Sequence, residues 1–176
     1  MLGAAGALAC LMAGTAIGAY VNGRRQGRLA LLRAQMDVLS GMRLMLAEER
    51  LRMADLLREG ANRAPPGDAG ALLQRRYALC AQFLDEQPLG GVAGAYLRAL
   101  TQTPCPCERQ EELAALDGLF RQLGSGTAAM REQAVAACLR RLKPIVEKAQ
   151  ESANTGGRLC LRLGMLLGLM AGIALW

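Results

Sequence analysis

The sequence predicts an all-α protein in which a helical bundle lies between an N-terminal and a C-terminal transmembrane helix. Every Lys, Arg, Asp and Glu lies between Arg24 and Arg162, so both ends of the chain are apolar and uncharged. The charged middle is rich in Ala, Leu, Arg, Gln and Glu, which favour helices, and it shows little strand-like alternation. These observations divide the chain into residues 1–23, 24–158 and 159–176.

The first apolar segment is long enough to anchor the protein in a membrane. As a helix rising about 1.5 Å per residue, the uncharged residues 2–21 span about 30 Å, the thickness of the hydrocarbon core. The alternative is a cleaved signal peptide, with the small residues at 16–18 as its cleavage site. Because no basic residue precedes the segment and several arginines follow it, an uncleaved anchor is the preferred interpretation.

The second apolar segment is shorter. Residues 159–176 reach about 27 Å as a helix, provided that Arg162 extends its side chain toward the lipid headgroups. Trp176 would then lie at the far interface, where tryptophan is favoured. A buried core helix is the alternative, but the segment is apolar all round, which favours a membrane helix.

The residues next to both segments are basic and predict the topology. The flanking cations are Arg24, Arg25, Arg28 and Arg33 after the first segment, and Lys148, Arg158 and Arg162 before the second. Basic flanks remain in the cytoplasm. Since both flanks belong to the middle of the chain, we expect a cytoplasmic helical bundle with both chain ends on the far side of the membrane.

Small residues recur every fourth position in both apolar segments. They are Gly6, Cys10, Gly14 and Gly18 in the first, and Cys160, Gly164, Gly168 and Gly172 in the second. Each set forms one ridge along its helix, and small ridges let helix backbones approach closely in lipid. The ridges are therefore candidate packing surfaces, either for each other or for a partner's spans. The alternative is that glycine is simply common in membrane helices.

The middle reads as a succession of helices. An apolar stripe runs from Leu29 to about Leu57, and glycines and prolines predict a loop over residues 60–70. Helices are predicted over residues 71–86, 92–100 and 108–123, with breaks at 88–91 and 103–107. Thr127 is a candidate N-cap for a last helix that extends to about Asn154 and is kinked at Pro144.

The sequence carries no recognisable catalytic or cofactor-binding motif. There is no histidine, which excludes Ser–His and Cys–His pairs, and no glycine-rich loop ends in Lys-Ser or Lys-Thr. Aromatic residues make up only 3% of the chain, so the net charge of +6 is not accompanied by a stacking surface for nucleic-acid bases. We therefore expect neither an enzyme nor a nucleic-acid-binding protein.

Six cysteines leave one further possibility, a metal site. Cys105 and Cys107 flank a proline, and Cys80 and Cys138 could join them, but the spacing lacks the paired short intervals of zinc sites. The preferred interpretation is a rigid loop with two incidental thiols in a reducing compartment. Two basic groups are candidate surfaces for an acidic partner or, alternatively, solvated helix faces: Arg75 with Arg76, and Arg140 with Arg141 and Lys143.

The order of several short motifs resembles the stage III sporulation protein AB family over nearly the whole chain. They are AYLRAL at 95–100, LAALDGLFRQLG at 113–124 and LGMLLG at 163–168, after an apolar start with basic residues behind it. The chain departs from the family pattern at Tyr96, where Trp is common.

This resemblance implies a function. The family belongs to the secretion-like channel complex between mother cell and forespore, and its soluble part is similar to the cytoplasmic domain of the type II secretion platform protein F. The expectation is a non-enzymatic platform subunit in the outer forespore membrane, with its soluble domain in the mother-cell cytoplasm. Its expected partners are a mother-cell secretion-type ATPase, the other channel membrane proteins and the lipid bilayer. The alternative is a secreted or extracytoplasmic helical adaptor with a cleaved signal peptide.

Overall fold

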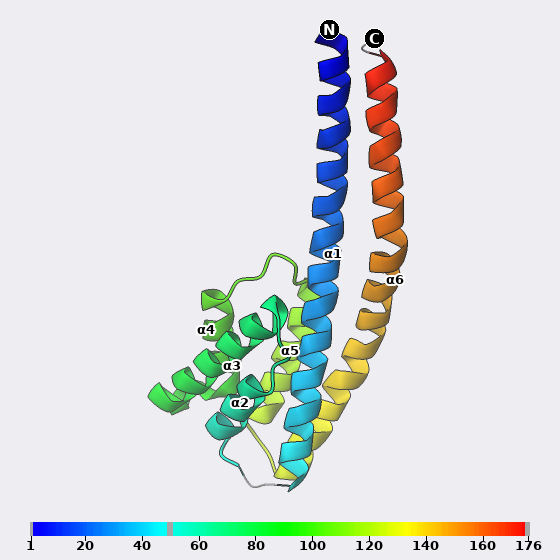
Figure 1. Cartoon of the computed structure of the whole chain (residues 1–176). Helices are drawn as coiled ribbons and strands as arrows, with labels where there is room; N and C mark the ends of the chain where they lie inside the picture. Colours follow the sequence, from blue (N-terminus) through cyan, green and yellow to red (C-terminus); the bar gives the residue numbers. More distant parts are fainter. Residues whose placement is uncertain (1, 49–50, 175–176) are drawn as a thin grey trace. The chain divides into compact units, whose positions relative to one another are not determined.

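The computed structural model describes residues 2–48 and 51–174, and its regular elements in this part are all helical (Figure 1). The elements are α1 (Leu2–Glu48), α2 (Met53–Asn62), α3 (Asp68–Glu86), the 3-10 helix η1 (Pro88–Gly90), α4 (Gly91–Gln102), α5 (Gln110–Leu123) and α6 (Ala128–Ala174). The prediction of an all-α fold is confirmed. The chain forms two compact units: the outer ends of α1 and α6, up to Leu29 and from Glu147, and residues 30–146.

The longest helices, α1 and α6, each contain 47 residues. They continue without a break through residues 23–24 and 158–159, where the sequence predicted domain boundaries. The predicted end of the last helix near Asn154 is wrong, because α6 continues to Ala174 with Pro144 inside it. Each long helix therefore contributes to both compact units.

Within residues 2–48 and 51–174, no helix has a stretch that is both long and apolar enough to cross a membrane. The two transmembrane helices therefore stay predictions. The side chains of residues 2–11 and 156–169, which make up most of both segments, lie outside the described part of the chain.

In the first unit the outer ends of α1 and α6 lie side by side (Figure 1). Gly18 and Leu29 of α1 are buried, and so are Ala149 and Ala153 of α6. Small side chains at positions four apart lie on one face of a helix, which allows close packing. At the surface of this unit the Arg24 guanidinium lies 5.9 Å from the centre of the Tyr20 ring, within range of a cation–π interaction.

The second unit has a core to which every one of its α-helices contributes. Its centre is an aromatic cluster in which Phe120 of α5 stacks on Tyr96 of α4 at 3.8 Å and lies 6.0 Å from Tyr77 of α3. Val38 and Leu142 bring buried apolar side chains from α1 and α6. The apolar stripe predicted between Leu29 and Leu57 is largely buried, as expected for an inward-facing helix surface.

The predicted loop over residues 60–70 is shorter in the structure. Only residues 63–67 separate α2 from α3, and Gly60 and Gly70 are buried inside these helices. Gly60 faces Met42 of α1, whose Cγ would lie 3.1 Å from a Cβ placed on the glycine. Both glycines therefore lie at close contacts inside helices, whereas the sequence suggested a turn.

Replacing Gly70 by alanine is expected to destabilise the protein. The new Cβ would lie 1.7 Å from the carbonyl oxygen of Pro65, a backbone atom, so the loop before α3 must move. Overpacking of this kind costs about 1–3 kcal/mol or more, and the thermal unfolding midpoint of the purified protein should fall accordingly. In the control Gly118→Ala a Cβ would meet nothing within 4 Å, and the helix should gain about 0.5–1 kcal/mol. Equal midpoints for the two variants would contradict this packing.

The start of α6 agrees with the prediction from Thr127. The Thr127 Oγ1 accepts a hydrogen bond from the Met130 N–H at 3.4 Å, and the Thr127 carbonyl accepts one from the Arg131 N–H at 3.0 Å. The preceding Gly126 has φ of +92°, a conformation that favours glycine. Thr127 is therefore confirmed as the N-cap.

Candidate functional site

Arg76 of α3 lies at the centre of a buried polar cluster in the second unit. It is 0% exposed. Its position follows from the helix period. Leu73, three positions earlier, and Cys80, four positions later, lie on the same buried face of α3, and the adjacent Tyr77 is buried as well. A buried guanidinium must be paired and hydrogen-bonded to be tolerated.

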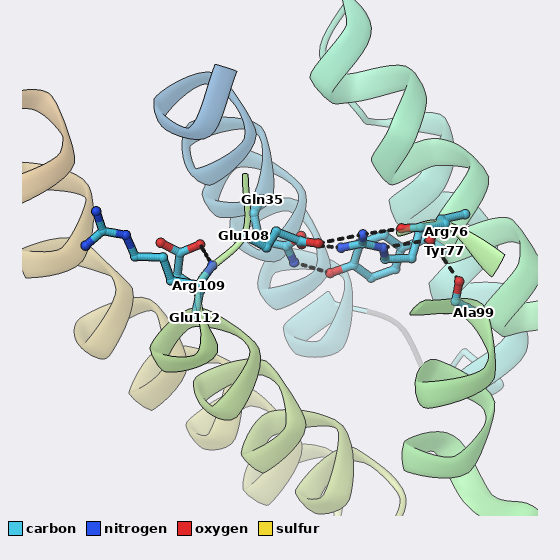
Figure 2. Close-up of polar contacts among 8 residues, drawn as sticks. Gln35, Arg76, Tyr77, Ala99, Glu108, Arg109 and Glu112 are labelled. Atoms are coloured by element: carbon cyan, nitrogen blue, oxygen red, sulfur yellow. Dashed lines mark hydrogen bonds and ion pairs between the residues drawn. The ribbon is translucent and has the colours of Figure 1, made fainter. Parts of the chain in front are cut away.

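The partners of Arg76 lie in the segment between α4 and α5 (Figure 2). Its Nη1 and Nη2 donate to Glu108 Oε1 at 2.5 Å and Oε2 at 2.9 Å, in a bidentate pair. Its Nε donates to Thr103 Oγ1 at 3.0 Å, and Nη2 also donates to the Thr103 carbonyl at 2.8 Å. The Thr103 hydroxyl in turn donates to the Ala99 carbonyl at 2.8 Å. Arg76 therefore fastens both ends of the segment at residues 103–108 to α3.

The electrostatics of the cluster favour a charged pair. Burial alone would lower the pKa of Arg76, but the hydrogen bonds and charge of Glu108, together with Tyr96, outweigh it and raise the pKa. The Glu108 side chain is only 9% exposed. Burial raises the pKa of the Tyr96 hydroxyl, an effect that the nearby Arg76 opposes. The cluster thus contains the Arg76–Glu108 salt bridge beside the neutral phenols of Tyr77 and Tyr96, and it holds the backbone of residues 103–108 in place.

Two further contacts extend the cluster (Figure 2). The buried Gln35 of α1 donates a hydrogen bond to the Tyr77 hydroxyl, which ties α1 to α3. At the start of α5 the buried Glu112 accepts a hydrogen bond from the Arg109 N–H at 3.0 Å. The polar cluster therefore joins α1 and α3 to the segment that leads from α4 into α5.

The structure changes the interpretation of one candidate basic surface. Arg76 does not lie on an exposed face with Arg75, because its guanidinium is buried on Glu108; only Arg75 is exposed. The second candidate surface remains available for contacts, since Arg140, Arg141 and Lys143 of α6 are all exposed.

The other predicted site residues lie in α1 and α6. Arg24 and Arg33 are exposed, whereas Arg25 and Arg28 are half-buried. Among the eight small ridge residues Gly18 is buried, and the side chains of the others lie outside the described part of the chain, as do those of Arg158 and Arg162. The packing of the two ridges therefore stays a prediction.

The four cysteines of the second unit are free thiols in different surroundings. Cys80 and Cys138 are buried, while Cys105 and Cys107 are half-buried in the segment held by Arg76. In the described residues no three Cys, Asp or Glu side chains gather in a way that could hold a metal ion. Burial raises the pKa of Cys80 to about 12 and that of Cys138 to about 11. Burial, reinforced by the neighbouring Cys105, raises the pKa of Cys107 to about 12.

These pKa values predict a loss of stability at alkaline pH. Cys80 and Cys138 have pKa values of about 12 and about 11 in the folded protein, against about 8.5 for an unfolded thiol. The contribution of these protonated thiols to the free energy of unfolding is therefore complete below about pH 8.5. Above about pH 8.5 the unfolded thiols lose their protons, and the free energy of unfolding falls by up to about 1.4 kcal/mol per thiol for each pH unit. Thermal unfolding midpoints between about pH 8.5 and about pH 10, below the titration of unfolded tyrosine, measure this effect.

The matched control for the alkaline prediction is the double variant Cys80→Ala/Cys138→Ala. It should have a lower midpoint at neutral pH, because two buried side chains are truncated, but a shallower decline with rising pH. The same decline in both proteins would show that these thiols do not set the alkaline limit.

The fold and the cluster define an all-helical protein whose central polar feature is a structural clamp. The family model for stage III sporulation protein AB matches residues 3–176, and the chain belongs to this family. Membership in this family implies that the protein has a role in sporulation. No curated protein and no solved structure matches the chain at a significant level.

Proposed function

We propose that the protein is a membrane-anchored, non-enzymatic platform subunit of the channel complex between mother cell and forespore. The observation that carries the proposal is the distribution of charge along two long helices. The N-terminal end of α1 and the C-terminal end of α6 are uncharged, and the same helices continue into the charged unit of residues 30–146. An anchor and a helical domain on shared helices are what a platform subunit requires.

The family and the Arg76 cluster support the same proposal. The family has a role in sporulation, and the clamp between Arg76 and Glu108 gives the helical unit fixed surfaces for partners. The proposed location is the outer forespore membrane, with the helical unit in the mother-cell cytoplasm. The proposed partners are the other membrane proteins of the channel and a secretion-type ATPase. Arg140, Arg141 and Lys143 are the candidate surface for an acidic face of that ATPase.

Extraction with alkaline carbonate tests the anchor. The wild-type protein should stay in the membrane pellet with the full-length mass. A variant with Leu8→Arg and Leu11→Arg should be released, because each arginine at a helix centre costs about 2.5–3.5 kcal/mol of insertion free energy. The control Leu89→Arg, at the fully exposed Leu89 of η1, should stay in the pellet. Release of the wild type would refute the anchor, and a mass shortened near residue 20 would favour the secreted adaptor.

A further inference from the structure

Two features of the unit at residues 30–146 have no partner within the described chain. The first is Leu89 in η1, which is 103% exposed at the corner between α3 and α4. The second is a hollow of about 380 Å³ between α1 and α6, lined by Ser40, Arg43, Leu44, Ala47, Glu132 and Leu139. Isolated exposed leucines are common, but a projecting leucine and an apolar hollow on one unit are mutually complementary.

The hollow suits one leucine side chain. Its apolar lining comes from Leu44, Ala47 and Leu139, and Leu44 is 59% exposed beside it. Its polar edge is already satisfied, because Arg43 Nε pairs with Glu132 Oε1 at 3.1 Å. A cavity of about 150 Å³ is enough for a small hydrocarbon, so the hollow has room for the Leu89 side chain. The glycines at 90 and 91 leave open space beside Leu89, since a Cβ on either would meet nothing within 4 Å.

The charges next to the two features are also complementary. Asp85 and Glu86, both exposed, precede Leu89 at the end of α3. Arg140, Arg141 and Lys143, all exposed, lie within four positions after Leu139 of the hollow, and Lys143, about one helical turn later, is on the same face as Leu139. Asp85 pairs with Arg58, whereas Glu86, as far as the described residues go, accepts a hydrogen bond from the neutral Gln82 alone, at 2.8 Å. Opposite charges of this kind orient an approaching partner.

We propose that a second copy of this chain docks its Leu89 corner into the hollow between α1 and α6. The contact joins two different surfaces, so it repeats from copy to copy and produces a ring or a row of subunits. The proposed contact is small compared with the roughly 1,200–2,000 Å² of surface that stable complexes bury. It is therefore weak between free chains and becomes effective when copies share one membrane, as the platform function would provide.

Cysteine cross-linking of the full-length protein tests the direction of this contact. In a background without native cysteines, Leu89→Cys and Ala47→Cys are combined in one chain and treated with a short bis-maleimide in membranes. The double variant should form a ladder of dimers, trimers and larger species, whereas each single variant stays monomeric. Co-expressed single variants should give dimers and no larger species. A Leu89→Cys variant that cross-links to itself, or a double variant without a ladder, would overturn the proposal.

A second measurement needs no cysteine background and keeps the test decisive if that background fails to fold. Leu89→Asn in the otherwise natural chain should reduce carbodiimide cross-linking between copies, which joins the carboxylates of Asp85 or Glu86 to the amine of Lys143, by about tenfold or more, because the contact loses its one buried leucine. Leu97→Asn is the matched control, because Leu97 is also exposed, at 47%, but lies outside both features. Equal losses in the two variants would contradict the contact. Both variants leave the cations of α6 intact, so binding of an ATPase to them is a separate outcome.

Discussion

Replacing Arg76 by methionine is expected to lower the thermal unfolding midpoint by about 10–20 °C. The change leaves the buried Glu108 carboxylate without its bidentate partner and removes the two hydrogen bonds that Thr103 accepts from Arg76. Breaking one side of a buried ion pair costs about 3–5 kcal/mol, and 1 kcal/mol corresponds to about 4 °C in a unit of this size. Circular dichroism of the purified full-length protein measures the midpoint.

The neighbouring arginine provides the control. Arg75→Met removes the same charge from the same helix, but Arg75 is exposed and should contribute within about 0.5 kcal/mol. The double variant Arg76→Met/Glu108→Leu should recover part of the loss, because no unpaired charge remains buried. Equal midpoints for Arg75→Met and Arg76→Met would mean that the clamp does not form.

Phe120→Ala is expected to destabilise the protein by about 3–5 kcal/mol, the usual cost of emptying a buried aromatic position. Phe120 is fully buried, and its ring centre lies 3.8 Å from that of the stacked Tyr96 and 6.0 Å from that of Tyr77. Its loss removes the ring contacts of α5 with Tyr77 of α3 and Tyr96 of α4. Urea unfolding curves, recorded by the circular dichroism of the helices, give the change in the urea concentration at half unfolding.

The second phenylalanine of the chain is the reference for this prediction. Phe83 of α3 is only half-buried, so Phe83→Ala should cost clearly less than Phe120→Ala. Phe120→Leu should fall between the two, because it keeps apolar volume but loses the stacked ring. If Phe83→Ala were the more damaging change, the centre of the core would have to be placed elsewhere.

The sequence predicted most helices because their ends carry strong local signals. Prolines and glycines mark the break at 103–107 and the turn before Thr127, and both breaks are confirmed. The loop predicted over residues 60–70 was too long, because glycine is found both in turns and at close contacts between helices. Which role Gly60 has depends on Met42 of another helix, and that contact has no local signature.

The Arg76 cluster was missed for a related reason. Two adjacent arginines suggest a surface, and that expectation outweighed the helix period, which places position 76 with the buried residues Leu73 and Cys80. The partner Glu108 lies 32 residues further along the chain, so no short-range pair of charges reveals the contact. Following the helix period for charged residues as well would have indicated a buried arginine.

Accessibility of a single cysteine tests the central claim of a cytoplasmic unit on membrane anchors. Ser125→Cys in a background without native cysteines is suitable, because Ser125 is exposed in the turn before α6, whereas Cys107 is half-buried with a pKa raised to about 12. The protein is produced in vegetative bacterial cells and treated with a membrane-impermeant maleimide. The account predicts labelling of Ser125→Cys only after lysis, with the full-length mass retained, and labelling of a cysteine appended after Trp176 in intact cells. Labelling of Ser125→Cys in intact cells would contradict the account and remove the platform function with it.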